Sequence, residues 1–98
     1  MIFEFKNVGI HLGTRSNGAN VREEIISAIK VTETPIVFDF TGVETVSNSF
    51  ADECFAKLLL LFPIEIIKQK TTFVNATPFI KAAIANSFKA RLSQLASA

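Results

Sequence analysis

The tripeptide Ser47-Asn48-Ser49 places a hydroxyl group on either side of an amide, between an apolar stretch and an amphipathic one. Hydroxyl groups at such a junction either cap a helix, by accepting a hydrogen bond from a first-turn N–H, or receive a phosphate that alters the surface a partner meets. The run from Ser49 to Asp52 matches the capping box, in which the acid reaches back to the cap residue. We therefore expect Ser49 to cap a helix, and a phosphate on Ser47 or Ser49 is the alternative.

Few other side chains could support catalysis. His11 and Cys54 are the only residues of their types, so a Cys-His nucleophilic pair would have to unite these two. Cys54 falls on the apolar side of the amphipathic stretch, one turn after Phe50, where nothing nearby would lower the thiol pKa. One histidine and one cysteine are also too few for a standard zinc site. We expect no catalytic residue, no metal ligand and no cofactor, and therefore no enzyme.

The segment from Gly13 to Gly18, GTRSNG, is a second candidate site. Its backbone N–H groups and Arg15 could surround a phosphate at the start of a helix, where the helix dipole favours anions. It lacks the Lys-Ser/Thr ending of a P-loop and the glycine spacing of a dinucleotide fingerprint. We favour a turn-forming loop, with anion or partner contacts by Arg15 and Arg22 as the alternative.

Asp39 and Gly42 have structural interpretations. Asp39 lies at the carboxyl end of the apolar run IVFDF, where a carboxylate more often accepts hydrogen bonds from the following loop than acts as a buried base. The pair Thr41-Gly42 breaks the run. We expect both residues to shape the turn after the strand.

The composition of the chain indicates a single domain, residues 1–98, with one apolar core, and its charge bears on the kind of partner. Of its 98 residues 49% are hydrophobic, and the ten Phe are accompanied by no Trp or Tyr, which points to a core and not to a wet binding surface. The net charge of +1 argues against a nucleic-acid partner, since such domains usually carry a strong basic excess. From Ile66 onward there are five basic residues and no acid, which fits a solvated helix face or, as the alternative, an anionic partner.

The predicted location is the cytoplasm. A single cysteine excludes an intramolecular disulfide, and the first residues, MIFEFKN, lack the segments of a signal peptide. The longest apolar run, Leu58 to Ile64, is far shorter than the ~20 residues of a membrane-spanning helix. We expect no membrane association.

Turn residues and apolar periodicity predict strands that alternate with helices. The first half of the chain gives a strand or short hairpin in residues 1–12, a loop in 13–20, a helix from about Asn20 to Lys30 capped by Asn20, and a strand in 36–40 covered on both faces. The second half gives a helix from about Ser49 that Pro63 ends, a strand ended by Asn75, and a last helix from Pro78 to about Leu95 capped by Thr77, with 64–70 unassigned. This order implies an α/β fold with a mostly parallel sheet of about four strands, an antiparallel edge being an option, flanked by helices.

Apolar residues at helical spacing mark the faces that should be buried. They are Val21, Ile25, Ala28 and Ile29 in the first helix, Phe50, Cys54, Leu58 and Leu61 in the second, and Ile80, Ala83, Ile84, Phe88, Leu92 and Leu95 in the last. Arg22, Glu23 and Lys30 fall outside the first of these faces and can stay in water.

Three segments in this order resemble a known family: GTRSNGANVREEI, DFTGVETVSNSFADECFAKL and TTFVNATPFIKAAI. They are similar to the STAS-like domains of unknown function of prokaryotes, which are relatives of the anti-sigma-factor antagonist (STAS) domains, and SFADE is the most specific segment. The resemblance implies a mixed sheet flanked by helices. It also implies that the loop opening the second helix is the place where true antagonists carry a phosphorylatable serine and bind an ATP-dependent kinase of the anti-sigma type.

The antagonists have a strand Asp followed by Asp-Ser-Ser-Gly at the helix start. When this pattern is aligned with the chain, Asp39 corresponds to the strand Asp and residues 47–50 correspond to the loop. Asn48 then stands at the position of the acceptor serine, and Phe50 at that of the glycine. An amide cannot be phosphorylated by a serine kinase, and only a shift of one residue would make Ser47 or Ser49 the acceptor. The resemblance therefore favours constitutive binding over a switch.

The leading hypothesis is a bacterial, non-enzymatic signalling module that docks a protein partner, such as a histidine-kinase-like ATPase, a serine kinase or another regulator. The docking segment is 47–55, with Ser47, Asn48, Ser49, Phe50, Asp52 and Glu53 as contacts, joined by Arg15 and Arg22. The alternative is phosphate, nucleotide or nucleic-acid binding through residues 13–22 and the basic last helix. A homodimer is compatible with either.

Overall fold

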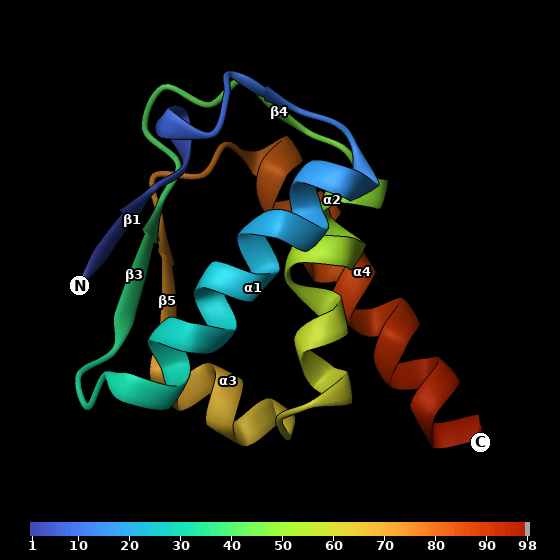
Figure 1. Ribbon diagram of the computed structural model, residues 1–98. Helices are drawn as coiled ribbons and strands as arrows, with labels where there is room; N and C mark the ends of the chain where they lie inside the picture. The colour runs from blue at the N-terminus through green and yellow to red at the C-terminus, as the bar shows by residue number, and fades with distance from the viewer. Residues whose placement is uncertain (98) are drawn as a thin grey trace.

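Strands and helices alternate along the chain in the computed structural model, which describes residues 1–97 (Figure 1). The elements are β1 (Ile2–Glu4), the 3-10 helix η1 (Phe5–Asn7), β2 (His11–Leu12), α1 (Arg15–Val31), β3 (Ile36–Asp39), β4 (Thr45–Val46), α2 (Asn48–Cys54), the 3-10 helix η2 (Ala56–Leu60), α3 (Ile64–Lys70), β5 (Thr71–Val74) and α4 (Pro78–Ser97). The predicted α/β class is confirmed.

The strands form two small parallel sheets. The larger has the order β1-β3-β5 and aligns Phe3 with Phe38 and Phe38 with Phe73, and the smaller pairs β2 with β4. All the pairings within residues 1–97 are parallel, so the antiparallel edge is not found there. The first twelve residues supply two strands and no hairpin, because η1 redirects the chain and each strand pairs with a different partner.

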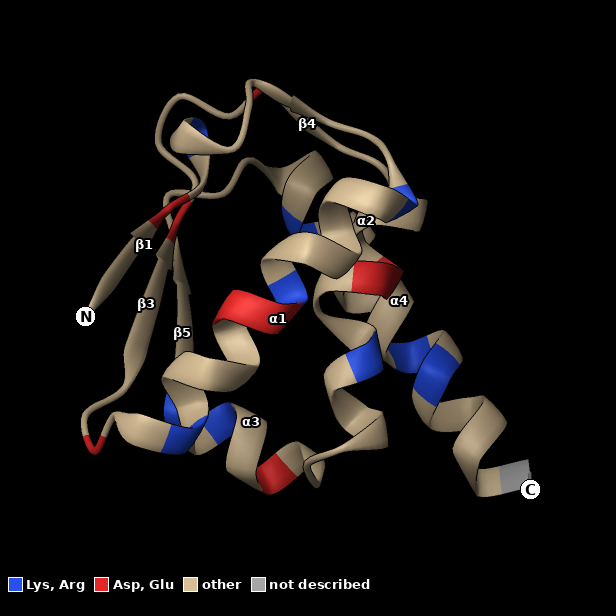
Figure 2. Cartoon of the chain, viewed as in Figure 1, with Lys and Arg blue, Asp and Glu red and all other residues tan. Residues whose placement is uncertain are grey.

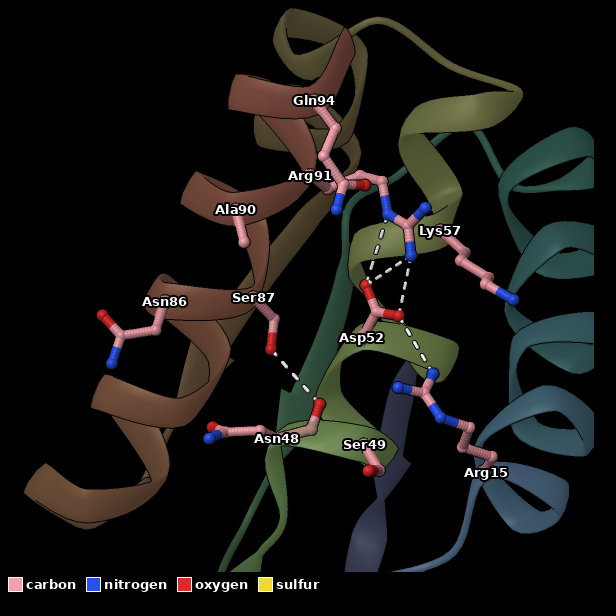
Figure 3. A pocket seen from close by; sticks show the side chains of 10 residues that line it. All are labelled: Arg15, Asn48, Ser49, Asp52, Lys57, Asn86, Ser87, Ala90, Arg91 and Gln94. Carbon is pink, nitrogen blue, oxygen red and sulfur yellow. Dashed lines mark hydrogen bonds and ion pairs between the residues drawn. The ribbon is translucent and has the colours of Figure 1, made fainter.

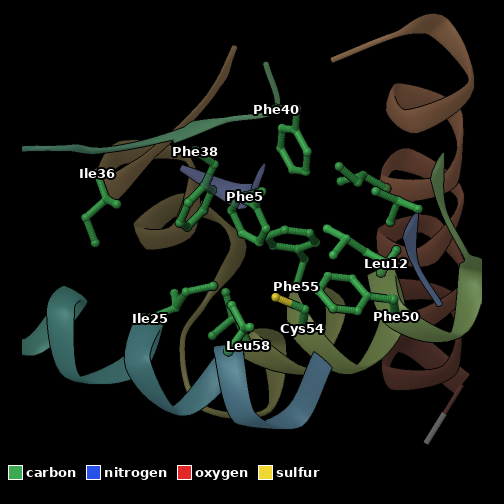
Figure 4. Close-up of a cluster of buried hydrophobic side chains, with 14 of the residues drawn as sticks. Phe5, Leu12, Ile25, Ile36, Phe38, Phe40, Phe50, Cys54, Phe55 and Leu58 are labelled. Carbon is green, nitrogen blue, oxygen red and sulfur yellow. The ribbon is translucent and has the colours of Figure 1, made fainter. Parts of the chain in front are cut away.

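The core lies between the larger sheet and the helices, which gather on one side of it in Figure 1. Phe5, Phe38, Phe40 and Phe55 are completely or almost completely buried there, and Figure 4 shows their rings close together. Burial alternates along β3, where Ile36 and Phe38 are buried but the residues that follow each are partly exposed. The prediction that this strand is covered on both faces is therefore wrong, since helices pack against one face only.

Helix α1 begins at Arg15, five residues before the predicted start. Thr14, not Asn20, is the N-cap, and its hydroxyl accepts a hydrogen bond from the N–H of Asn17 (3.2 Å). The segment GTRSNG is thus mostly helical and not a loop, although two Gly and two Asn disfavour a helix. Gly18 faces α2 so closely that a Cβ would lie 2.9 Å from Glu53 Cβ and 3.0 Å from the Phe50 carbonyl oxygen, so packing against α2 overrides the local preference.

The other helices follow the prediction in part. Helix α2 gives way to η2 after Cys54, and Leu61, where the chain turns toward α3, is 60% exposed and not buried as predicted. The unassigned residues 64–70 form α3. The cap of α4 is confirmed, because the Ile80 N–H donates to Thr77 Oγ1 (3.2 Å). The predicted apolar face of α4 is buried at Ile80, Ala83 and Ile84. Farther along the helix it is exposed to solvent, at Leu92 (39% exposed) and Leu95 (43% exposed).

Candidate functional site

Ser47, and not Ser49, caps α2. Its hydroxyl accepts a hydrogen bond from the Phe50 N–H (3.0 Å) and donates one to the Gly13 carbonyl (3.0 Å), so it also ties the loop before α1 to α2. The capping box was misplaced by two residues, because Asp52 does not reach back to the helix start but turns toward α1 and α4.

Replacing Ser47 with alanine is expected to lower the free energy of unfolding by about 1 kcal/mol, the usual cost of losing a helix cap. Ser49→Ala should stay within about 0.5 kcal/mol, since Ser49 makes no capping hydrogen bond. Urea denaturation of the two variants measures both values. Equal effects, or a larger one at Ser49, would contradict this assignment of the cap.

A polar hollow of about 600 Å³ opens beside the first turn of α2 (Figure 3). We call it the α2–α4 hollow. It is lined by Arg15 from α1, Asn48, Ser49 and Asp52 from α2, Lys57 from η2, and Asn86, Ser87, Ala90, Arg91 and Gln94 from α4. Asn48 is exposed and Ser49 is partly exposed, so both can be reached from solvent.

Asp52 is the charged centre of the hollow. Arg91 binds both of its carboxylate oxygens, with Nη2 at 2.8 Å from Oδ1 and 2.7 Å from Oδ2, and Arg15 Nη1 lies 3.1 Å from Oδ2. In Figure 3 the two guanidinium groups approach the carboxylate from α4 and α1. Burial alone raises the pKa of Asp52, but the hydrogen bonds and charges of Arg91 and Arg15 outweigh it and hold the pKa below its ordinary value.

Glu53 continues the charge network under α1. Its carboxylate accepts a hydrogen bond from Lys57 (2.5 Å), which is the main reason that its pKa is lowered, and Arg22 donates to its backbone carbonyl. The second carboxylate oxygen, Oε2, is buried without a hydrogen bond, 3.7 Å from Arg15 and 3.8 Å from Arg22. Arg22 was placed outside the apolar face of its helix, where it could lie in water, but its side chain is only 19% exposed because it packs on Glu53.

The Asp52 network predicts acid sensitivity. Because the folded-state pKa of Asp52 lies below the ordinary 3.8, its stabilisation is complete above that pH and is lost as the pH falls through the folded value. Asp52→Asn should cost about 2 kcal/mol at neutral pH, the usual value of hydrogen bonds to a charged group. As the pH falls through and below 3.8 the variant should also lose less stability than wild type. Denaturation at several pH values tests this, and parallel curves would contradict it.

The predicted site residues separate into two groups. Arg15, Asn48, Ser49 and Asp52 meet in the α2–α4 hollow, whereas Phe50 is fully buried and Glu53 is 8% exposed. Sequence reasoning missed the wall supplied by α4. Arg91 belongs to the basic end of the chain, which was interpreted as a solvated face or, as the alternative, the site of an anionic partner. Its actual partner, Asp52, lies 39 residues away in the sequence.

Asp39 and Gly42 have the structural roles predicted for them. Asp39 Oδ1 accepts hydrogen bonds from the Thr41 N–H (3.0 Å), the Thr41 hydroxyl (2.7 Å) and the Asn75 side chain (3.1 Å). These bonds, that of the Thr41 N–H most of all, lower the pKa of Asp39. Gly42 has a φ of +83°, a conformation that favours glycine and turns the chain after β3.

The remaining reactive side chains lie apart. His11 is exposed on β2, where Nδ1 is 2.9 Å from the Thr45 hydroxyl, and Cys54 is fully buried, which raises its thiol pKa. Nowhere in residues 1–97 do three or more His, Cys, Asp and Glu side chains gather as a metal site would require. None of the helices in this range has the length and apolarity needed to cross a membrane.

The fold and the α2–α4 hollow define an α/β domain with a polar site at the start of its second helix, and comparison with known proteins gives its family. A family model described as a STAS-like domain of unknown function (DUF4325) matches residues 17–81. The chain belongs to this family, since the match covers more than half of it, and the resemblance noted in its sequence is confirmed. No curated protein matches the chain, and no solved structure does either.

Proposed function

We propose that this STAS-like domain is a non-enzymatic regulatory module that binds a protein partner through the α2–α4 hollow. One observation carries the proposal: Asn48, which the resemblance places at the position of the antagonists' switch serine, and its neighbour Ser49 are accessible from solvent, whereas Phe50 beside them is part of the core. A partner that docks on the start of α2 therefore meets Asn48, Ser49 and the neighbouring polar side chains of α1 and α4.

The charge network prepares the hollow for binding. Asp52 orients Arg91 through both carboxylate oxygens and Arg15 through one, so the remaining N–H donors of Arg91 in particular need little further ordering when a partner arrives. The amides of Asn48, Asn86 and Gln94 add groups that both donate and accept hydrogen bonds. Such a surface suits the polar rim of a protein interface.

The chemistry of the hollow supports a binding role over catalysis. Its hydroxyl groups, Ser49 and Ser87, have no histidine beside them within residues 1–97, and the Asp52 carboxylate is occupied by two guanidinium groups. The Ser87 hydroxyl donates to the Ala83 carbonyl (2.9 Å) and is thereby engaged. A general base with a free lone pair is missing from this group of residues.

We further propose constitutive binding to a cytoplasmic partner of the histidine-kinase-like ATPase or serine-kinase type. Asn48 cannot accept a phosphate, and the Ser47 hydroxyl is used twice, as acceptor from Phe50 and donor to Gly13. Ser49 is the hydroxyl left for a kinase, so a phosphate found there would turn the module into a switch.

Substitution of arginine for residues that line the α2–α4 hollow tests the proposal. Affinity capture from the native cell and mass spectrometry identify the partner, and calorimetry with the purified partner gives its affinity. Asn48→Arg and Ser49→Arg should each weaken binding at least about tenfold by filling the hollow. Ser27→Arg, at an exposed serine of α1, is the matched control and should bind as wild type. Unchanged affinity in both hollow variants would reject this surface, and a phosphate on Ser49 in the captured protein would reject constitutive binding.

A second candidate function, phosphate or nucleotide binding, has one observation in its favour. Arg15 from the 13–22 segment and Arg91 from the basic last helix meet in the same hollow. Both are already paired with Asp52, so an anion would have to compete with that carboxylate. Thermal stabilisation by ATP or inorganic phosphate that weakens in Arg15→Ala and with salt would support this candidate, and its absence would remove it.

A further inference from the structure

An apolar groove of about 520 Å³ lies along β5, apart from the α2–α4 hollow. We call it the β5 groove. Its two walls are helical faces with the same spacing: Ile64, Ile67 and Lys68 on α3, and Ala85, Phe88, Lys89 and Leu92 on α4. Thr71, Thr72 and Phe73 of β5 form the third side. Each helical face therefore offers apolar side chains and one lysine.

The groove follows the open edge of the larger sheet. Successive side chains of a strand point to opposite faces, so a groove that touches three successive residues of β5 runs along the edge of that strand. The strand order β1-β3-β5 leaves β5 paired on one side only. The Val74 carbonyl accepts from the Phe40 N–H (3.1 Å) toward β3, so the peptide groups of Phe73, one residue earlier, point to the open edge.

The rim of the groove is positively charged and uncompensated. Within residues 1–97 no carboxylate lies in ion-pair range of Lys68 or Lys89. Figure 2 shows basic but no acidic residues along α4, and from Ile66 onward the chain has no acid. A second copy that brought its α4 onto this groove would place lysines beside lysines, so charge disfavours self-association and favours an acidic occupant.

We propose that the β5 groove binds an extended segment of a protein partner that has apolar residues at alternate positions and Asp or Glu at both ends of the same face. The segment adds a strand to the open edge of β5 and forms backbone hydrogen bonds with Phe73. Its apolar side chains cover Ile64, Phe88 and Leu92, which are partly or largely exposed, and its terminal carboxylates meet Lys68 and Lys89. This site shares no lining residue with the α2–α4 hollow, so it neither rests on the function proposed there nor fails with it.

The test uses the capped seven-residue peptide Glu-Thr-Val-Thr-Val-Thr-Glu as the probe, in which both Val and both Glu lie on one face of the strand, with ¹H–¹⁵N NMR spectra of the whole chain as the readout. The amide of Phe73 should shift and become protected from exchange as the peptide is added. Replacing Glu by Lys in the peptide should weaken binding at least ~10-fold, because two attractions become repulsions. N-methylation should abolish binding when it is placed on the alternate set of peptide nitrogens that faces β5, since it removes the donors that pair with this strand, and should have little effect on the other set.

Variants of the chain complete the test. Lys89→Glu should weaken the acidic peptide at least ~5-fold, and Lys68→Glu combined with Lys89→Glu should reverse the preference toward the lysine peptide. Lys81→Glu, at an exposed lysine of α4 outside the groove, is the matched control and should bind as wild type.

Several results would overturn the proposal. One is an unchanged Phe73 amide at millimolar peptide, and another is equal binding of the two peptides. A third is a dimer in sedimentation that Leu92→Glu dissociates, which would make a second copy the occupant. The last is attachment to anionic phosphatidylserine vesicles that the double lysine variant loses while the peptide has no effect, which would make the groove a lipid site.

Discussion

Phe55→Ala is expected to lower the free energy of unfolding by about 4 kcal/mol, the largest effect among the substitutions considered for this chain. The Phe55 ring is fully buried and contacts five other rings, those of Phe5, Phe38, Phe40, Phe50 and Phe73, with centroids 5.2 to 6.5 Å away. Its removal leaves a cavity between the larger sheet and α2 that these rings can fill only by leaving their rotamers. Domains of this size are stable by only about 5 to 15 kcal/mol, so the variant should be unfolded in part at moderate temperature.

Phe79→Ala is the matched control for this experiment. It deletes the same side chain from the first turn of α4, where the ring is 87% exposed, and should change stability by less than about 0.5 kcal/mol. Thermal and urea denaturation of the two variants compare the positions directly. A loss of less than 1 kcal/mol in Phe55→Ala, or similar losses in both variants, would contradict the core described above.

The order and type of the main elements could be predicted because local patterns and packing agree there. The strand IVFDF is apolar and bounded by turn residues, and the pair Thr77-Pro78 supplies a cap and a first helical residue, so both elements form where they were expected. Asp39 was interpreted correctly for the same reason, since its partner Thr41 is two residues away in the sequence.

The errors arise where a distant segment decides the local structure. Thr14 starts α1 inside a segment rich in Gly and Asn, because Gly18 lets α1 approach α2 closely. Phe55 was missed as a core residue because a regular helix through Leu61 was assumed, whereas α2 ends at Cys54 and a 3-10 helix follows. A change of helix type shifts the positions that face the core, and nothing in residues 54 to 56 signals it.

Only one of the two walls of the candidate site could be predicted from the sequence. The start of α2 is visible in the sequence through its hydroxyl and amide residues, and the family pattern points to the same place. Its second wall comes from α4, where Arg91 is 39 residues away from Asp52. A single sequence does not show which basic residue meets which acid. The α2–α4 hollow could therefore be recognised only from the fold, which brings Arg91 to Asp52.

Gly18→Val is expected to lower the free energy of unfolding by about 3 kcal/mol. A Cβ at position 18 would meet Glu53 Cβ and the Phe50 carbonyl oxygen at 2.9 Å and 3.0 Å, and neither atom belongs to the free end of a side chain that could move aside. Helix α1 must therefore shift away from α2. Because Arg15 lies one turn before Gly18, the shift should also weaken the contact between Arg15 and Asp52, now 3.1 Å long, and open the hollow on that side.

The sign of this effect separates packing from helix propensity. Valine is the better helix former by a few tenths of a kcal/mol, so if local preference governed the position, Gly18→Val would stabilise the chain slightly. Asn20→Val introduces the same side chain at an exposed position of α1 and should be neutral within about 0.5 kcal/mol, and Gly13→Ala, where a Cβ meets nothing within 4 Å, should be neutral or slightly stabilising. Urea denaturation of the three variants gives the comparison. A Gly18→Val protein as stable as wild type would mean that α1 and α2 are not held at the distance on which the Arg15–Asp52–Arg91 arrangement depends.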